Sequence, residues 1–157
     1  GEQQKGMRSG TENVPGIAGL GAAVEEIYCH HEERVDWLYH LRKRFIDGIR
    51  TIEGTRINGY PDERNAPHIV SVSFSGVRSE VLLHALEDKE IYVSAGSACS
   101  SNHPSVSHTL QNIGLPKELL HSTLRFSFSI YTTEEEIDET IDALRGLLPM
   151  LRRYRRG

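Results

Sequence analysis

The sequence predicts a mixed α/β fold in which helices pack on a small sheet. Its 157 residues are enough to bury a core, and we expect one domain over residues 1–157. Apolar residues recur at helical spacing over residues 13–52 and 137–151. Over residues 68–74 and 123–129 they alternate with polar residues, which is typical of strands with one buried face.

The first helical segment is long, and we expect it to bend near His30. Asn13 is a suitable N-cap, and Pro15 stands in the first turn, where its missing N–H costs little. The three glycines between residues 16 and 21 each cost about 1 kcal/mol relative to alanine. We interpret them as points of close packing on a buried helix. Gly54 is expected to end the segment.

Shorter elements follow Gly54. Residues 94–107 are small and polar with no helical or strand period, so we expect a loop there. The final helix begins at the capping box Thr133-x-x-Glu136. Its acidic first turn and basic last turn both complement the helix dipole. The remaining expected elements are an edge strand over residues 55–58, a helix over 79–86, a short strand over 91–93 and one helical turn over 110–113.

The composition excludes several classes of protein. A net charge of −4 argues against a nucleic-acid partner, whose binding surface would need to be basic. No apolar run approaches the length of a membrane span, and no signal peptide opens the chain, so we expect no membrane partner. The two cysteines, Cys29 and Cys99, cannot form a disulfide scaffold, which favours a reducing, cytoplasmic location.

Cys99 is the candidate nucleophile because it lies in the polar loop directly after a predicted strand. A thiol there can be reached and can ionise to the thiolate. The alternative is a small buried apolar residue, which is what we expect of Cys29. His103 and His108 follow Cys99 at a spacing that matches no zinc site, but either can donate a proton near the thiol.

Two further features could bind an anion. Arg125 stands inside the predicted strand over residues 123–129, where it either points into a cleft and holds a carboxylate, or lies on the solvent face opposite Leu124 and Phe126. Residues 8–11 (Arg-Ser-Gly-Thr) offer N–H groups, hydroxyls and a guanidinium before a helix, which suits a phosphate. The same residue types are also ordinary helix caps.

Three motifs in the chain resemble those of a known family. They are Gln4-x-Gly6-x-Arg8-Ser9-Gly10-Thr11-x-Asn13, Ser94-Ala95-Gly96-Ser97-Ala98-Cys99 and Leu124-Arg125-Phe126-Ser127-Phe128-Ser129-x-Tyr131-Thr132-Thr133-Glu134-Glu135-Glu136-Ile137-Asp138. From about residue 3 to residue 151 the chain resembles the C-terminal part of NifS/IscS-type cysteine desulfurases, pyridoxal-phosphate enzymes of the class V aminotransferase group. The resemblance implies the small domain of a fold-type I enzyme, an α+β sandwich with a mostly antiparallel sheet.

The resemblance also implies a role for individual residues. Cys99 would take sulfur from L-cysteine as a persulfide, with release of L-alanine. Arg125 would hold the substrate carboxylate, and Thr11 would contact the cofactor phosphate from the neighbouring subunit of a homodimer. The implied sulfur acceptors are iron–sulfur scaffold and tRNA-thiolation proteins. Cys99 would be a metal ligand only if it shared a cluster with such a scaffold.

One part of the family pattern is absent from this chain. The Schiff-base lysine of the family lies in a Ser-x-His-Lys motif, and none of Lys5, Lys43, Lys89 and Lys117 follows a histidine. We therefore expect the large pyridoxal-phosphate domain to be a separate part, so that this chain is a fragment or half of a split enzyme. Alone it would not turn over cysteine. The alternatives are a stand-alone persulfide carrier or interaction module, or part of a selenocysteine lyase.

Overall fold

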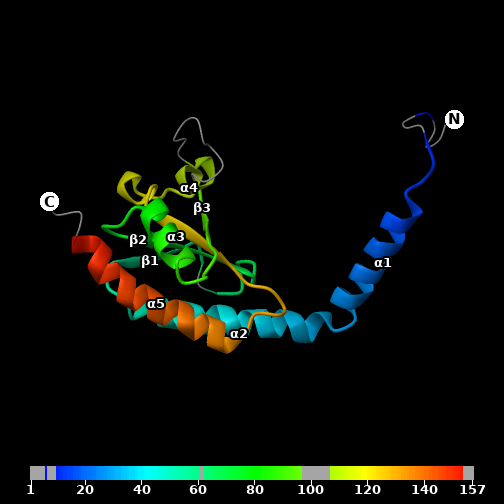
Figure 1. Ribbon diagram of the computed structural model, residues 1–157, viewed down its shortest axis with the longest axis horizontal. Coiled ribbons are helices and arrows are strands. Elements are labelled where there is room, and N and C mark those ends of the chain that lie inside the picture. Colours follow the sequence, from blue (N-terminus) through cyan, green and yellow to red (C-terminus); the bar gives the residue numbers. More distant parts are fainter. Residues whose placement is uncertain (1–5, 7–9, 61, 97–106, 154–157) are drawn as a thin grey trace. The chain divides into compact units, whose positions relative to one another are not determined.

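The computed structural model describes residues 6, 10–60, 62–96 and 107–153. The chain divides into two compact units, Gly1–Arg34 and Val35–Gly157. Figure 1 shows the order of the elements along the chain. Each unit is described by itself below.

The first unit consists mainly of α1 (Val14–Tyr28) and the start of α2 (His31–Arg50). The two helices are separate, with a break at Cys29 and His30, where we expect the long helical segment to bend. Asn13 is the N-cap as predicted, and its side chain accepts from the N–H of Gly16 at 3.1 Å. None of the helices that the structure describes has the length and hydropathy needed to cross a membrane.

Two expectations about the first unit are not met. Cys29 is exposed rather than buried, and its Sγ donates to the carbonyl oxygen of Glu26 at 3.4 Å. It forms the C-cap of α1, outside any core. Likewise α1 buries none of its residues, although its glycines indicate a buried helix.

The second unit contains a four-stranded antiparallel sheet. Its strands are β1 (Thr55–Asn58), β2 (Ile69–Phe74), β3 (Ser94–Ala95) and β4 (Thr123–Ser127). Their spatial order is β1-β2-β4-β3, so β1 lies at the edge as predicted. All three pairings are antiparallel, which confirms the expected α+β class.

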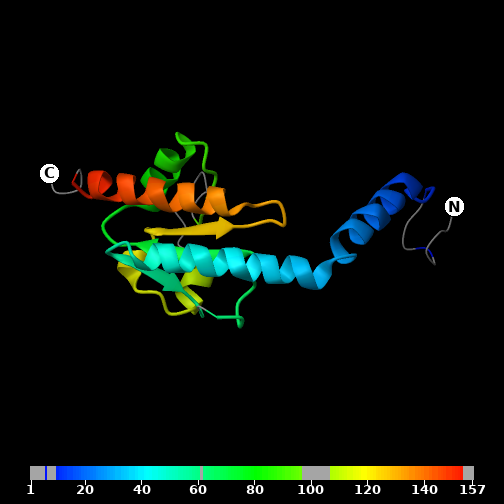
Figure 2. The ribbon, with the colours of Figure 1, turned by 90° about the horizontal axis from the view of Figure 1, so that it is seen from below.

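The core lies on one face of this sheet. Alternation along β2 and β4 directs Val72, Phe74 and Leu124 to that face, where each is at most 1 % exposed. Helices α2 and α5 (Glu134–Arg153) run side by side along it, as Figures 1 and 2 show, and α3 (Ser79–Glu87) packs against α5 and β4. The short helix α4 (His108–Asn112) lies on the opposite side of the sheet in Figure 1.

The start of α5 and its approach to α2 follow from particular residues. The capping box is confirmed, because the N–H of Thr133 donates to Glu136 Oε2 at 2.8 Å and the N–H of Glu136 donates to Thr133 Oγ1 at 3.2 Å. A Cβ added to Gly48 of α2 would lie 2.9 Å from Cγ1 of Ile141 of α5. Glycine therefore allows the two helices to come close at this point.

The predicted strand over residues 91–93 is wrong. The pairing is instead made by the next two residues, Ser94 and Ala95, which the sequence pattern assigns to a loop. Ile91 and Val93 are half-buried against the core without ladder hydrogen bonds. Apolar side chains gave the strand signal, but the register with β4 decides which residues pair.

Candidate functional site

A row of polar side chains crosses all four strands on one face of the sheet. The register pairs Asn58 with Ser71, Ser71 with Arg125, and Arg125 with Ser94. Directly opposed residues of antiparallel strands point to the same face, and successive residues alternate. Because Leu124 is fully buried on the core face, this row lies on the other face.

This polar row lines a cavity of about 380 Å³. Its other wall comes from α4 and the turn that follows, through Leu110 and Ile113. The sequence left two positions open for Arg125, one facing a cleft and one on the solvent face, and the structure shows features of both. Its side chain is exposed opposite Leu124, and it also faces a cavity whose volume suits a small molecule.

The guanidinium of Arg125 is held on one side only. Its Nη2 donates to Ser94 Oγ at 3.3 Å, across the β3–β4 pairing. Within the part of the chain that the structure describes, no carboxylate forms an ion pair with Arg125, whereas Arg44, Arg64 and Arg145 each form at least one. A guanidinium carries five N–H donors, so Arg125 keeps donors for a bidentate carboxylate.

The residues on either side of the Cys99 segment lie at this same cavity. Cys99 and His103 themselves fall in residues 97–106, outside the described residues. Gly96 and Ser107, which flank that segment, both line the cavity with Arg125. A Cβ added to Gly96 would lie 3.2 Å from Cβ of Ser107, so the two flanks approach each other there. His108 follows as the exposed first residue of α4.

Thr11 lies in the first unit, two residues before the N-cap of α1, and is exposed. The N–H groups of the first turn of α1 are already used: Gly16 donates to the Asn13 side chain and Ile17 to the Asn13 carbonyl. Gly10, with φ +97°, adopts a backbone conformation that favours glycine just before Thr11. A phosphate here would therefore be bound through Thr11 and Gly10 rather than by the helix N-terminus.

The described lysines do not provide a Schiff base beside Arg125. Lys43 is ion-paired with Asp47 on the surface of α2. Lys89 and Lys117 are exposed, and none of these three lysines lines the Arg125 cavity. Among the described residues, Arg125 has donors for a substrate carboxylate, but no lysine at its cavity provides the covalent attachment of pyridoxal phosphate.

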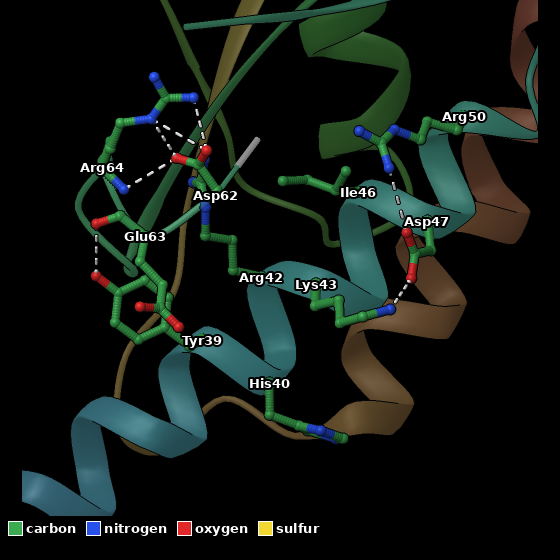
Figure 3. Close-up of a pocket in the computed structure, with 10 residues that line it drawn as sticks. All are labelled: Tyr39, His40, Arg42, Lys43, Ile46, Asp47, Arg50, Asp62, Glu63 and Arg64. Atoms are coloured by element: carbon green, nitrogen blue, oxygen red, sulfur yellow. Dashed lines mark hydrogen bonds and ion pairs between the residues drawn. The ribbon is translucent and has the colours of Figure 1, made fainter. Parts of the chain in front are cut away.

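A larger groove of about 950 Å³ lies between α2 and the loop after β1, as Figure 3 shows. Five of its charged side chains pair with one another. Asp47 bridges Lys43 and Arg50, and Arg64 binds Asp62 through Nη2–Oδ2 at 2.6 Å. The hydrogen bonds from Arg64 lower the pKa of Asp62 to about 2. These charges are compensated within the groove, so it is a weaker candidate for ligand binding than the Arg125 cavity.

Arg42 of α2, at the base of this groove, is 3 % exposed and has a structural role. Its guanidinium donates to the carbonyl oxygens of Ile69 at 2.5 Å and Tyr60 at 2.9 Å. Burial lowers the pKa of Arg42 below that of an exposed arginine. The side chain therefore ties the loop after β1 to α2.

Comparison with known proteins shows the family of the chain. The model of the aminotransferase class-V family matches residues 1–140, and the chain belongs to that family. It is similar to the cysteine desulfurase IscS of Methanosarcina thermophila, at 41% identity over 97% of this chain and 37% of the relative. It is also similar to the cysteine desulfurase IscS of Salmonella paratyphi C, at 42% identity over 100% of this chain and 40% of the relative.

Solved structures show the same fold. A NifS-like protein superposes with a TM-score of 0.79 at 30% identity, over 96% of this chain and 38% of that one. The NifS-like protein of Rickettsia africae superposes with a TM-score of 0.80 at 25% identity, over 95% of this chain and 38% of that one. The chain therefore spans about two fifths of the length of the relatives that it matches.

The three predicted site residues fall in three different parts of the chain. Arg125 is placed at a cavity, Thr11 belongs to the other unit, and Cys99 lies outside the described residues. Sequence reasoning missed Asn58 and Ser71, which continue the Arg125 row across the sheet. Alternation in each strand shows that these residues face away from the core, but only the strand order shows that they are neighbours.

Proposed function

We propose that this chain is the C-terminal part of a pyridoxal-phosphate-dependent cysteine desulfurase. In it, Cys99 receives sulfur from L-cysteine and Arg125 holds the substrate carboxylate. One observation carries the proposal: Gly96 and Ser107, on either side of the Cys99 segment, line the same cavity as Arg125. Cys99 follows Gly96 by three residues, and three residues of chain reach at most about 11 Å.

The proposed sulfur transfer forms one S–S bond and breaks one C–S bond. The Cys99 thiolate forms an S–S bond with the sulfur of the substrate cysteine while the substrate C–S bond breaks. The electron pair of that bond stays on carbon, which takes up a proton, so the products are alanine and a Cys99 persulfide. Pyridoxal phosphate, when bound, supplies the electron sink. The fork of Arg125 fixes the substrate carboxylate with two parallel hydrogen bonds and so orients the substrate.

The proposal extends to the whole protein. The missing large domain would provide the lysine, and Thr11 would contact the cofactor phosphate across the interface of a homodimer. The persulfide would pass to an acceptor such as an iron–sulfur scaffold or tRNA-thiolation protein in the cytoplasm. The relatives named cysteine desulfurase support this class of reaction.

Alanine and sulfide release test the proposal. We expect neither product from this chain with added cysteine, pyridoxal phosphate and reductant. A chimaera in which this chain replaces the matching part of the Methanosarcina thermophila relative should release both in equal amounts. Cys99→Ala should abolish both products, and Cys29→Ala should leave them unchanged. Release by the chain alone would contradict the argument from the missing lysine, and a Cys99→Ala chimaera that still works would contradict the role of Cys99.

A stand-alone persulfide carrier is the second candidate, favoured by the absence of any described lysine at the Arg125 cavity. A carrier would take one sulfur atom from polysulfide onto Cys99 with no other chain present. Mass spectrometry of the chain after such treatment measures this directly. Replacing cysteine by selenocysteine in the chimaera assay distinguishes a desulfurase from a selenocysteine lyase.

A further inference from the structure

A chain of buried hydrogen bonds crosses the sheet beneath the Arg125 cavity. The hydroxyl of Thr123 on β4 donates to the carbonyl oxygen of Leu119 at 2.7 Å, and the same oxygen lies 2.7 Å from Ser73 Oγ on β2. Ser73 Oγ in turn lies 2.9 Å from Nδ2 of Asn58 on β1. The side chains of Asn58, Ser73 and Thr123 are all buried, so water does not compete for these bonds.

The Leu119 carbonyl fixes the direction of every bond in this chain, because each hydroxyl has one hydrogen to donate. Thr123 uses its hydrogen on that carbonyl, so it accepts from Ser73. Ser73 then has only lone pairs left for Asn58, which therefore presents Nδ2 rather than Oδ1. The Oδ1 atom of Asn58 is buried and has no hydrogen-bond partner among the described residues. A buried polar atom without a partner is uncommon, and it often marks a functional group.

The second N–H of Asn58 determines what Ser71 can offer to a ligand. It donates to Ser71 Oγ at 3.2 Å, so the serine oxygen accepts and its own hydrogen remains free. Ser71 is half-buried and lines the Arg125 cavity, and no described residue accepts from its hydroxyl. This hydrogen is therefore available inside the cavity.

The polar side of the cavity consists of hydrogen-bond donors around one positive charge. Ser94 also keeps its hydroxyl hydrogen, because its Oγ accepts from Arg125 Nη2. Ser71 is directly opposite Arg125 in the β2–β4 ladder, and the Cβ atoms of such pairs are about 5 Å apart. Donors beside a guanidinium favour a carboxylate and disfavour an amide, which brings N–H groups of its own. Leu110 and Ile113 line the other wall and can contact a short apolar tail.

We propose that Ser71 is a second carboxylate-binding residue of this cavity. Its hydroxyl donates to one oxygen of the carboxylate that Arg125 holds. Asn58, Ser73 and Thr123 are positioning residues, which keep that hydroxyl turned toward the ligand. The inference rests on the proposed function and adds to it the class of ligand that the chain binds by itself. Because all of these residues belong to the Val35–Gly157 unit, the chain binds a short monocarboxylate without the large domain or pyridoxal phosphate.

Binding of propionate to this chain tests the inference, with propionamide as the neutral control. In an NMR titration, propionate should shift the Nε–H signal of Arg125 and the backbone amide signal of Ser71, and propionamide should shift neither. Ser71→Ala should weaken propionate binding about tenfold, the size expected for a hydrogen bond to a charged group. Ser127→Ala is the matched control, because Ser127 is exposed on β4 and does not line the cavity. Unchanged binding in Ser71→Ala, or no binding of propionate by the chain, would overturn the inference.

Variants of Thr123 test the positioning residues. Thr123→Val frees the hydroxyl of Ser73 to donate to a reversed Asn58 amide, and the amide oxygen then also draws the hydroxyl of Ser71 away from the cavity. Propionate binding should weaken as much as in Ser71→Ala, and the double variant Ser71→Ala/Thr123→Val should bind no more weakly than Ser71→Ala. Thr123→Ser keeps the hydroxyl and should bind as the unmodified chain does. Additive losses, or an equal loss in Thr123→Ser, would indicate packing and contradict the positioning roles.

Desulfuration separates the inference from the proposed function. In the Methanosarcina thermophila chimaera, Ser71→Ala should raise KM for cysteine about tenfold with little change in kcat. A chimaera without sulfide release, made from a chain that binds propionate as expected, refutes the proposed function alone. An active chimaera whose KM is unchanged in Ser71→Ala refutes the inference alone.

Discussion

Arg125 differs from the other arginines of its unit in what accepts its hydrogen bonds. Arg42 donates to the backbone carbonyl oxygens of Ile69 and Tyr60, and Arg44 and Arg64 bind carboxylates of the same chain. Arg125 has one described acceptor, the hydroxyl of Ser94, and lines a cavity. Its position on β4 is set by ladder pairing on both sides, so the guanidinium is presented from a rigid element.

Replacing Arg125 tests its proposed contact with the substrate. In the chimaeric enzyme, Arg125→Lys should raise KM for cysteine at least tenfold with a smaller change in kcat, because a point charge replaces a bidentate fork. Steady-state alanine release measures both constants. Arg56→Lys is the matched control, since Arg56 is exposed on β1 and does not line the cavity. An unchanged KM in Arg125→Lys would remove Arg125 from substrate binding.

Arg42 provides a residue-scale prediction about stability. Arg42→Met keeps the apolar stem but leaves the carbonyls of Ile69 and Tyr60 without their donor. The expected loss in free energy of unfolding is about 3 kcal/mol, since a hydrogen bond from a charged donor contributes about 1.5–3 kcal/mol. Urea unfolding measures it. Arg50→Met, at an exposed position of the same helix, should change stability by less than about 0.5 kcal/mol. Equal effects at the two positions would contradict the role of Arg42.

At the scale of elements, the close approach of α2 and α5 depends on Gly48. Gly48→Ala improves helix propensity by about 1 kcal/mol, but the new Cβ would overlap the side chain of Ile141, which is 5 % exposed. Because overpacking costs about 1–3 kcal/mol, we expect a net destabilisation of about 1 kcal/mol. Gly146 of α5 is the control: an added Cβ meets nothing within 4 Å, so Gly146→Ala should stabilise by up to about 1 kcal/mol. Thermal unfolding of both variants gives the comparison, and a stabilised Gly48→Ala would contradict the packing argument.

The sequence predicts most elements correctly because their signals are local. Alternation identifies β2 and β4, and the Thr133–Glu136 pair marks the start of α5. The exceptions depend on contacts distant in sequence. Ser94 and Ala95 become a strand only because Arg125 and Leu124 pair with them, and Arg42 is buried only because the loop after β1 folds over it. The neighbours of Arg125 in the polar row could not be predicted for the same reason, since local pattern does not fix strand order.

At the scale of the whole molecule, the two units differ in how they are stabilised. The Val35–Gly157 unit has a continuous core that joins α2, α3, α5 and the sheet. In the first unit, α1 has one side-chain cap and no buried residue. The sequence predicts that α1 is a buried helix, but none of its residues is buried in the structure. An apolar helix that is exposed in this way indicates an interface. Neither its composition nor its exposure indicates this alone.

We expect acid to destabilise the Val35–Gly157 unit, because two of its carboxylates are paired with arginines. The hydrogen bond from Arg44 of α2 lowers the pKa of Asp138 of α5, and Arg64 lowers the pKa of Asp62 to about 2. A carboxyl whose pKa is lower in the folded state stabilises the fold above its unfolded pKa, which is about 3.9. That contribution is lost as the pH falls through the folded pKa. We therefore expect the Tm to decline between about pH 4 and pH 2 beyond any decline between pH 7 and pH 5.

Asp138→Asn separates this effect from general acid unfolding. The variant removes the titrating group that joins α2 to α5, so it should lower the Tm at pH 7 and reduce the decline between pH 4 and pH 2. Asp142→Asn, at an exposed site paired only within α5, should leave the slope nearly unchanged. Circular dichroism melts across this pH range measure both variants. If Asp138→Asn shows the same decline as the unmodified chain, the Arg44–Asp138 contact does not couple the two helices at acid pH.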